Sequence, residues 1–147
     1  VVDDAVALVR ASAENSGAEI TVMTDEASIL VRADAIMLRQ VVLNLLNNAI
    51  DALAGPGRIV VRARTERNGI GSAHAVVSVS DTGRGVPAEH LPRIFDPFFT
   101  TKDIGRGVGL GLAICQSFIE QHGGTIRADS PGVGGGTTVE FELPLEP

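Results

Sequence analysis

The strongest constraint on the fold is one long amphipathic segment between residues 34 and 53. Asp34 is a good N-terminal helix cap, and the run Gly55-Pro56-Gly57 stops a helix. Between them, apolar residues recur with the helical period at Leu38, Val42, Leu45, Leu46, Ala49 and Leu53. A helix of this length with one apolar stripe must bury that stripe, so the rest of the chain must supply a sheet or further helices.

The segments on either side of this helix carry strand and helix patterns. Alternating β-branched residues at 58–64 and 75–79, separated by the polar run 68–72, predict an antiparallel hairpin. Residues 19–24 and 29–31 predict two short strands or one hairpin. Two final strands are expected at 125–128 and 137–143, and further helices at 2–13 and 110–122. The sum is an α+β fold in which helices cover one face of a sheet.

Composition narrows the classes of function. A chain of 147 residues with 44% hydrophobic residues suits one domain with a real core. A net charge of −6 without Trp or Tyr argues against binding to nucleic acid. One cysteine excludes an internal disulfide, and neither a signal peptide nor a long apolar run is present, so we expect a soluble, cytoplasmic domain. Because the chain starts at Val1 rather than Met, we expect a fragment of a longer protein.

The long helix carries an unusual polar stripe. Asn44, Asn48 and Asp51 stand at i, i+4 and i+7 and therefore share one face. Asn is a poor helix former, and a solvated face would more naturally carry Lys, Glu or Arg. Two interpretations remain open: a solvated face, or hard oxygen ligands for a Mg²⁺ ion that a triphosphate also holds.

Three glycine-rich segments follow. The segment 81–85, Asp-Thr-Gly-Arg-Gly, ends a predicted strand and is either a turn or a ligand site. Alternate glycines at 105–111 run into a helix and present backbone N–H groups suited to phosphate, with Lys102 and Arg106 just before them or among them. Residues 134–138, Gly-Gly-Gly-Thr-Thr, are by themselves most simply a flexible turn.

Taken together and in this order, these motifs resemble the catalytic ATP-binding domain of sensor histidine kinases, in the superfamily that includes gyrase B, MutL and the ninety-kilodalton heat-shock chaperones. Residues 38–49 resemble the N box of this family, residues 81–85 its first glycine box and residues 94–102 its F box. Residues 107–112 resemble its second glycine box, and residues 134–138 its closing segment. The resemblance covers 1–147 as one domain, with a dimerisation and phosphoacceptor domain missing upstream. It implies a two-layer sandwich, in which a mixed, mostly antiparallel sheet of about five strands packs on about three helices.

The resemblance also implies roles for individual residues. Asn48 would ligate Mg²⁺, Asn44 would lie beside the phosphates, and Asp81 would accept a hydrogen bond from the adenine amino group. Asn44, Asn48 and Lys102 are the expected catalytic residues, and segment 86–106 would be a mobile lid. The remaining expected nucleotide contacts are Asp51, Gly83, Gly85, Val86, Ile94, Phe99, Thr100, Thr101, Lys102, Arg106, Gly107, Val108, Gly109, Leu110, Gly111, Leu112 and Thr137.

Three positions refine this expectation. Asn44 stands where the ATP-hydrolysing branch of the superfamily carries a Glu base, and an amide cannot take a proton from water, so transfer to a partner group is favoured over hydrolysis. Asp51, with the run 97–102, looks like the nitrogen-regulation and dicarboxylate-sensing subgroup. Val108 stands where a Thr or Ser is common, which removes a hydroxyl contact.

The implied function is transfer of the γ-phosphoryl group of Mg·ATP to a histidine on the dimerisation domain, for relay to an aspartate of a response regulator. None of His74, His90 and His122 lies in a phosphoacceptor motif, so each is expected to be structural. The expected partners are ATP or ADP, the protein's own dimerisation domain and a cognate response regulator. We expect no contact of this domain with nucleic acid or membrane. The parent protein is a candidate inner-membrane sensor. Two alternatives stay open: a free-standing serine kinase of the same superfamily, and a non-catalytic nucleotide-binding docking module.

Overall fold

In the part of the chain that the structure describes, the fold is a two-layer arrangement of three α-helices on one five-stranded sheet. The computed structural model describes residues 1–24, 29–53, 55–68, 72–99 and 111–145. The helices are α1 (Val2–Asn15), α2 (Ala35–Leu53) and α3 (Gly111–Gln121), and a 3-10 turn spans Leu91–Arg93. The strands are β1 (Ala18–Thr24), β2 (Gly57–Asn68), β3 (Ser72–Asp81), β4 (Thr125–Asp129) and β5 (Thr137–Pro144). The predicted α+β class, the three helices and the five strands are confirmed.

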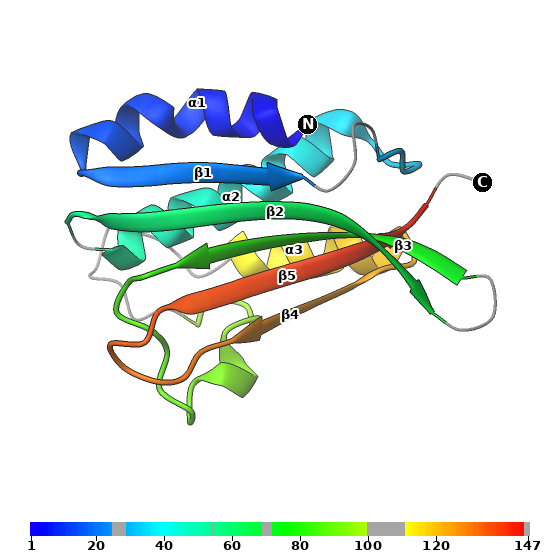
Figure 1. Ribbon diagram of the computed structural model, residues 1–147. Helices are drawn as coiled ribbons and strands as arrows, with labels where there is room; N and C mark the ends of the chain where they lie inside the picture. Colours follow the sequence, from blue (N-terminus) through cyan, green and yellow to red (C-terminus); the bar gives the residue numbers. More distant parts are fainter. Residues whose placement is uncertain (25–28, 54, 69–71, 100–110, 146–147) are drawn as a thin grey trace.

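The sheet has the order β1-β2-β3-β5-β4 (Figure 1). Three of its four pairings are antiparallel, and β1 alone runs parallel to its neighbour β2. The mixed, mostly antiparallel sheet is therefore confirmed, and so is the predicted antiparallel pairing of β2 with β3. Because β3 lies between β2 and β5, residues that end β3 are enclosed on both sides by neighbouring backbone.

All three helices pack on the same face of the sheet, and the core lies between the two layers (Figure 1). The apolar stripe of α2 is its centre, since Leu45 and Leu46 have at most 2% of their surface exposed. From the sheet, Ile59 and Val61 of β2 meet this stripe and are fully buried. Burial of such aliphatic side chains supplies the main driving force for folding.

The start of α2 follows from its sequence. The Asp34 carboxylate oxygen Oδ1 accepts hydrogen bonds from the backbone N–H groups of Ile36 and Met37, at 2.9 and 3.1 Å. These bonds satisfy two of the N–H groups that the first turn of a helix leaves without an internal partner. The predicted cap at Asp34 is confirmed.

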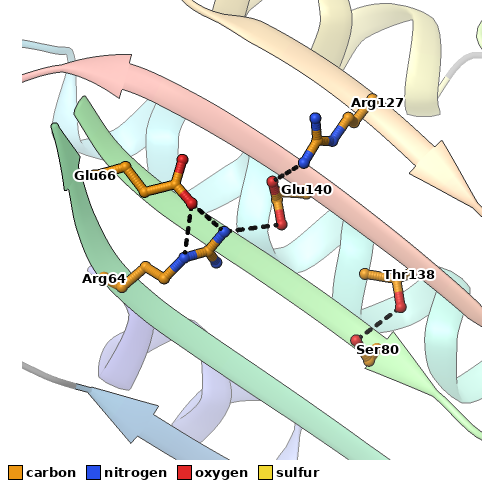
Figure 2. Close-up of polar contacts among 6 residues, drawn as sticks. All are labelled: Arg64, Glu66, Ser80, Arg127, Thr138 and Glu140. Atoms are coloured by element: carbon orange, nitrogen blue, oxygen red, sulfur yellow. Dashed lines mark hydrogen bonds and ion pairs between the residues drawn. The ribbon is translucent and has the colours of Figure 1, made fainter. Parts of the chain in front are cut away.

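The other face of the sheet is polar, as the alternation in the strands predicts. Arg64 Nη2 lies 2.8 Å from Glu66 Oε1 and 3.5 Å from Glu140 Oε2, and Arg127 Nη2 lies 2.7 Å from Glu140 Oε1 (Figure 2). This network joins side chains of β2, β5 and β4. Charged side chains therefore lie over this face of the sheet, whereas helices pack on the opposite face.

One predicted element is wrong. Residues 29–31 form neither a strand nor a hairpin with β1; within them, Val31 makes a single isolated bridge to Leu145. The reason is that a short apolar run does not determine its own partner: β1 pairs in parallel with β2, and Val31 meets the chain after β5 instead of β1. Predicted element ends also shift, because β2 and β3 both extend beyond the predicted limits. None of the helices in the described part of the chain combines the length and hydropathy that a bilayer crossing requires.

Candidate functional site

Several of the candidate residues meet at one end of the sheet, where β3 and β4 end and β5 begins (Figure 1). In the register of the sheet, Asp81 pairs with Thr137, and Asp129 pairs with Thr138. The last turn of α2 reaches the same place, because the Arg84 N–H donates to the Ala52 carbonyl at 3.0 Å. Segments 81–85 and 134–138, which are far apart in the sequence, are therefore adjacent in space.

Asp81 is the half-buried acidic group of this site. Its Oδ1 accepts a hydrogen bond from the Gly83 N–H at 2.8 Å, a local turn that fixes the orientation of the carboxyl group. Burial raises the pKa of Asp81 above its usual value, and hydrogen bonds from the Gly83 and Thr137 backbone and the charge of Arg84 oppose that rise. A desolvated carboxylate held by backbone donors is an oriented acceptor, suited to a donor group that enters the site.

The glycines beside Asp81 are required by close backbone contact. A Cβ at Gly83 would lie 2.4 Å from the Ala52 carbonyl oxygen. Gly136 has a φ of +76°, and a Cβ there would meet the Asp81 carbonyl oxygen at 2.2 Å. No residue with a side chain fits either place without movement of the backbone, so these glycines set the shape of the site.

A hollow of about 300 Å³ opens at this end of the sheet. It is lined by Asp81, Asp129, Ser130, Pro131, Gly135, Gly136, Thr137 and Thr138. Its size lies at the lower end for small-molecule sites, and its walls offer the carboxylates of Asp81 and Asp129 together with hydroxyl and backbone groups. The resemblance predicted Asp81 and Thr137 as ligand contacts, and both line this hollow.

Asn44, on the polar stripe of α2, is half-buried rather than solvated. Asn44 Oδ1 accepts from Gln40 Nε2 at 3.1 Å, and Asn44 Nδ2 donates to Cys115 Sγ at 3.7 Å, which joins α2 to α3. Asn48 is likewise half-buried, whereas Asp51 is exposed. The amide oxygens of Asn44 and Asn48 and the carboxylate of Asp51 follow one face of α2, and Asn44 contacts α3.

The remaining predicted residues fall into two groups. Gly111 and Leu112 begin α3, Val86 follows the Asp81 loop, and Ile94 and Phe99 lie in the segment around the 3-10 turn. Phe99 packs against its own segment, with the Arg93 guanidinium carbon 4.8 Å from its ring centroid and the His90 ring in an edge contact. Outside the described residues lie the predicted positions Thr100, Thr101, Lys102, Arg106, Gly107, Val108, Gly109 and Leu110.

Sequence reasoning missed two features of the site. It did not predict the contact of Asn44 with Cys115, which is fully buried in the core. It also did not single out Ser130, which lines the hollow. A serine directly after a strand and before Pro-Gly is an ordinary turn residue, so no local signal distinguished it.

Comparison with known proteins identifies the family. Residues 33–147 match the family model described as histidine kinase-, DNA gyrase B-, and HSP90-like ATPase. The chain belongs to this family of ATP-binding domains, as its sequence motifs predicted.

Within the family, the similar proteins are sensor kinases. The chain is 40% identical over 145 residues to the sensor histidine kinase ZraS of Klebsiella oxytoca, and 39% identical over 145 residues to the sensor protein FixL of Bradyrhizobium diazoefficiens. These matches cover 99% and 98% of the chain but only 30% and 28% of the relatives, so the chain spans less than a third of their length.

Solved structures give the same fold. The catalytic domain of histidine kinase ThkA matches with a TM-score of 0.85 and 31% identity, covering 99% of this chain and 92% of that one. Full-length ShkA in complex with AMPPNP matches with a TM-score of 0.82 and 30% identity, covering 98% of this chain and 29% of that one. The two-layer fold is therefore that of histidine kinase catalytic domains.

Proposed function

We propose that this chain is the catalytic domain of a two-component sensor histidine kinase, which binds Mg·ATP and transfers the γ-phosphoryl group to a histidine on a separate dimerisation domain. The observation that carries the proposal is the hollow between the ends of β3 and β5, where a half-buried Asp81 carboxylate is held by backbone donors. The match over 92% of the ThkA catalytic domain supports the assignment as a catalytic domain, and the AMPPNP complex of ShkA supports a nucleotide as the ligand.

In this proposal Asp81 reads the base. Its orientation is fixed by the Gly83 N–H, which leaves the carboxylate able to accept from the exocyclic amino group of adenine. Thr137 pairs with Asp81 across the sheet and lines the same hollow. A nucleotide whose base carries a carbonyl in place of that amino group would set two acceptors against each other, so the site should favour adenine.

The face of α2 carries the polar groups assigned to the phosphate side. Asn48 is proposed to contribute an amide oxygen to Mg²⁺, which shields phosphate charge when bound and usually takes only one or two protein oxygens. The donor set fits this use: α2 supplies hard oxygens, and no three His, Cys, Asp or Glu side chains in the described ranges form a metal cage. Asn44, held between Gln40 and Cys115, is proposed to lie beside the phosphates.

Transfer rather than hydrolysis follows from Asn44. A water molecule needs a base to become a nucleophile, and an amide side chain cannot accept its proton at neutral pH. Phosphoryl transfer depends mainly on positioning and charge stabilisation, and in this proposal the acceptor histidine brings its own nucleophilic nitrogen. Lys102 and the glycine-rich run 105–111 are proposed to supply charge and backbone donors to the phosphates.

The proposed partners are the protein's own phosphoacceptor domain, as a further part of a longer chain, and a cognate response regulator. A ThkA structure in complex with the response regulator protein TrrA matches this chain with a TM-score of 0.81 and 30% identity, covering 99% of this chain and 39% of that one. We place the domain in the cytoplasm, where ATP is abundant, and assign it to the nitrogen-regulation or dicarboxylate-sensing subgroup on the strength of Asp51 and run 97–102.

The test is phosphorylation of the full-length protein with γ-labelled ATP and Mg²⁺. Asn48→Ala and Asp81→Asn should each lower incorporation at least about 100-fold, whereas Asn47→Ala, an exposed residue on the same helix, should leave it within about twofold. The label should be lost in acid and kept in alkali, as a phosphohistidine is. Acid-stable label on a separate protein would support the serine kinase instead, and nucleotide binding without any transfer would support the docking module.

A further inference from the structure

We propose that Ser130 is a positioning residue for the nucleotide site, because its hydroxyl group locks the Asp81 loop onto the turn between β4 and β5. Ser130 lies directly after β4 and is half-buried. The inference rests on the proposed function, and it adds a residue that controls how well the site recognises the base.

The Ser130 hydroxyl uses all of its hydrogen-bonding capacity on backbone groups. It accepts from the Val86 N–H at 3.0 Å and from the Gly132 N–H at 3.2 Å, and its own proton is donated to the Gly136 carbonyl at 2.7 Å. A serine hydroxyl has one donor and two acceptor positions, so none remains for another partner. Such complete use by main-chain groups of Val86, Gly132 and Gly136 indicates a structural role rather than a group that awaits a ligand.

The lock joins two segments that form the hollow. Val86 ends the loop that begins at Asp81, and Gly136 lies beside the Asp81 backbone. Two further backbone bonds run in parallel with the serine: the Gly134 N–H donates to the Arg84 carbonyl at 2.6 Å, and the Gly136 N–H donates to the Gly83 carbonyl at 3.2 Å. Unlike these two backbone bonds, the Ser130 contact to Val86 is made by a side chain, so a substitution can remove it.

Gly85 explains why the junction is tight enough for a single hydroxyl to matter. Gly85 has a φ of +74°, and a Cβ there would meet the Gly132 carbonyl oxygen at 2.0 Å and Ser130 Oγ at 3.1 Å. The two backbones therefore touch at this point. Loss of the Ser130 hydroxyl would leave the Val86 N–H without its partner at a place where the neighbouring backbone obstructs a replacement, so the loop is expected to shift.

The test compares Ser130→Ala with a matched control. Ser80→Ala also removes one half-buried hydroxyl beside β5, since Ser80 and Thr138 are hydrogen-bonded at 2.9 Å on the polar face of the sheet (Figure 2). Titration with ADP and with inosine diphosphate gives the affinity for each nucleotide, and their ratio measures how well the site selects adenine. Hydrogen exchange at the Val86 amide measures the lock itself.

Ser130→Ala is expected to weaken ADP binding about 5- to 30-fold, to reduce the preference for ADP over inosine diphosphate at least about threefold, and to speed exchange at Val86. Ser80→Ala should leave affinity and preference unchanged. Ser130→Thr, which keeps a hydroxyl, should bind closer to the wild type than Ser130→Ala does. An equal loss for both nucleotides, or unchanged binding in Ser130→Ala, would overturn the positioning role. If the folded wild-type domain binds no nucleotide, the proposed function fails first and this inference fails with it.

Discussion

The packing around Gly83 gives a sharp test of the site. A methyl group at this position would lie 2.4 Å from the Ala52 carbonyl oxygen, 2.6 Å from the Ala52 carbonyl carbon and 2.9 Å from Asp81 Oδ1. Real Cβ atoms essentially never approach closer than 3.0 Å, so in Gly83→Ala the loop and the end of α2 must separate by about 0.6 Å or more. The atoms in contact are mainly backbone and cannot rotate away.

This separation has two consequences. Forced repacking of this kind typically costs about 1–3 kcal/mol of folding free energy. It also strains two hydrogen bonds: the one from the Arg84 N–H to the Ala52 carbonyl, and the one from the Gly83 N–H to Asp81 Oδ1, which orients the Asp81 carboxyl group. Because a displacement of about 1 Å in a binding constellation can cost roughly 100-fold, we expect ADP affinity to fall about 10- to 100-fold in Gly83→Ala.

The matched control is Gly124→Ala. A Cβ at Gly124 would meet the Glu142 carbonyl oxygen at 2.0 Å, a similar clash with backbone at the start of β4. Both variants should melt several degrees below the wild type, by roughly 2–4 °C per kcal/mol. Only Gly83→Ala should lose nucleotide affinity in calorimetric titration. Equal affinity in the two variants would refute the reasoning, and so would a Gly83→Ala protein that melts and binds like the wild type.

Two further predictions concern the core. Leu46 is fully buried, so Leu46→Ala should lower the free energy of unfolding, measured by urea titration, by about 2–5 kcal/mol. The control Leu8→Ala changes a residue that is 62% exposed and should alter the free energy of unfolding by less than about 0.5 kcal/mol. Similar losses in the two variants would contradict the core assignment. Burial raises the pKa of Cys115 to about 11, so maleimide labelling of the native protein should be slow at pH 8 and should rise with pH towards 11, because only the thiolate reacts. Rapid labelling of the native protein at pH 8, followed by mass spectrometry, would contradict that burial.

Local patterns predicted the elements that local physics controls. The helical period and the Asp34 cap gave α2, and β-branched alternation gave the β2–β3 hairpin, because these signals depend on neighbours in the sequence. The ordered motifs then gave the family. The parallel pairing of β1 with β2 was not predictable in this way, since it depends on how α2 carries the chain back across the sheet.

The parts of the site that sequence reasoning missed depend on distant contacts. Ser130 bonds to the amide of Val86, which lies 44 positions away, and Cys115 meets Asn44 from 71 positions away. Neither contact leaves a trace in local composition, because a turn serine and a core cysteine look the same with or without it. The site is therefore predictable in its motif residues and not in the residues that hold them in place.

The central claim is that the end of the sheet around Asp81 binds an adenine nucleotide and that the α2 asparagine face holds its magnesium. The most direct measurement is calorimetric titration of this domain with ADP and with a non-hydrolysable ATP analogue, each with and without Mg²⁺. We expect both nucleotides to bind, the triphosphate only with Mg²⁺, and both to be lost in Asp81→Asn. A folded domain that binds neither nucleotide under any of these conditions, or binds both equally well in Asp81→Asn, would contradict the claim.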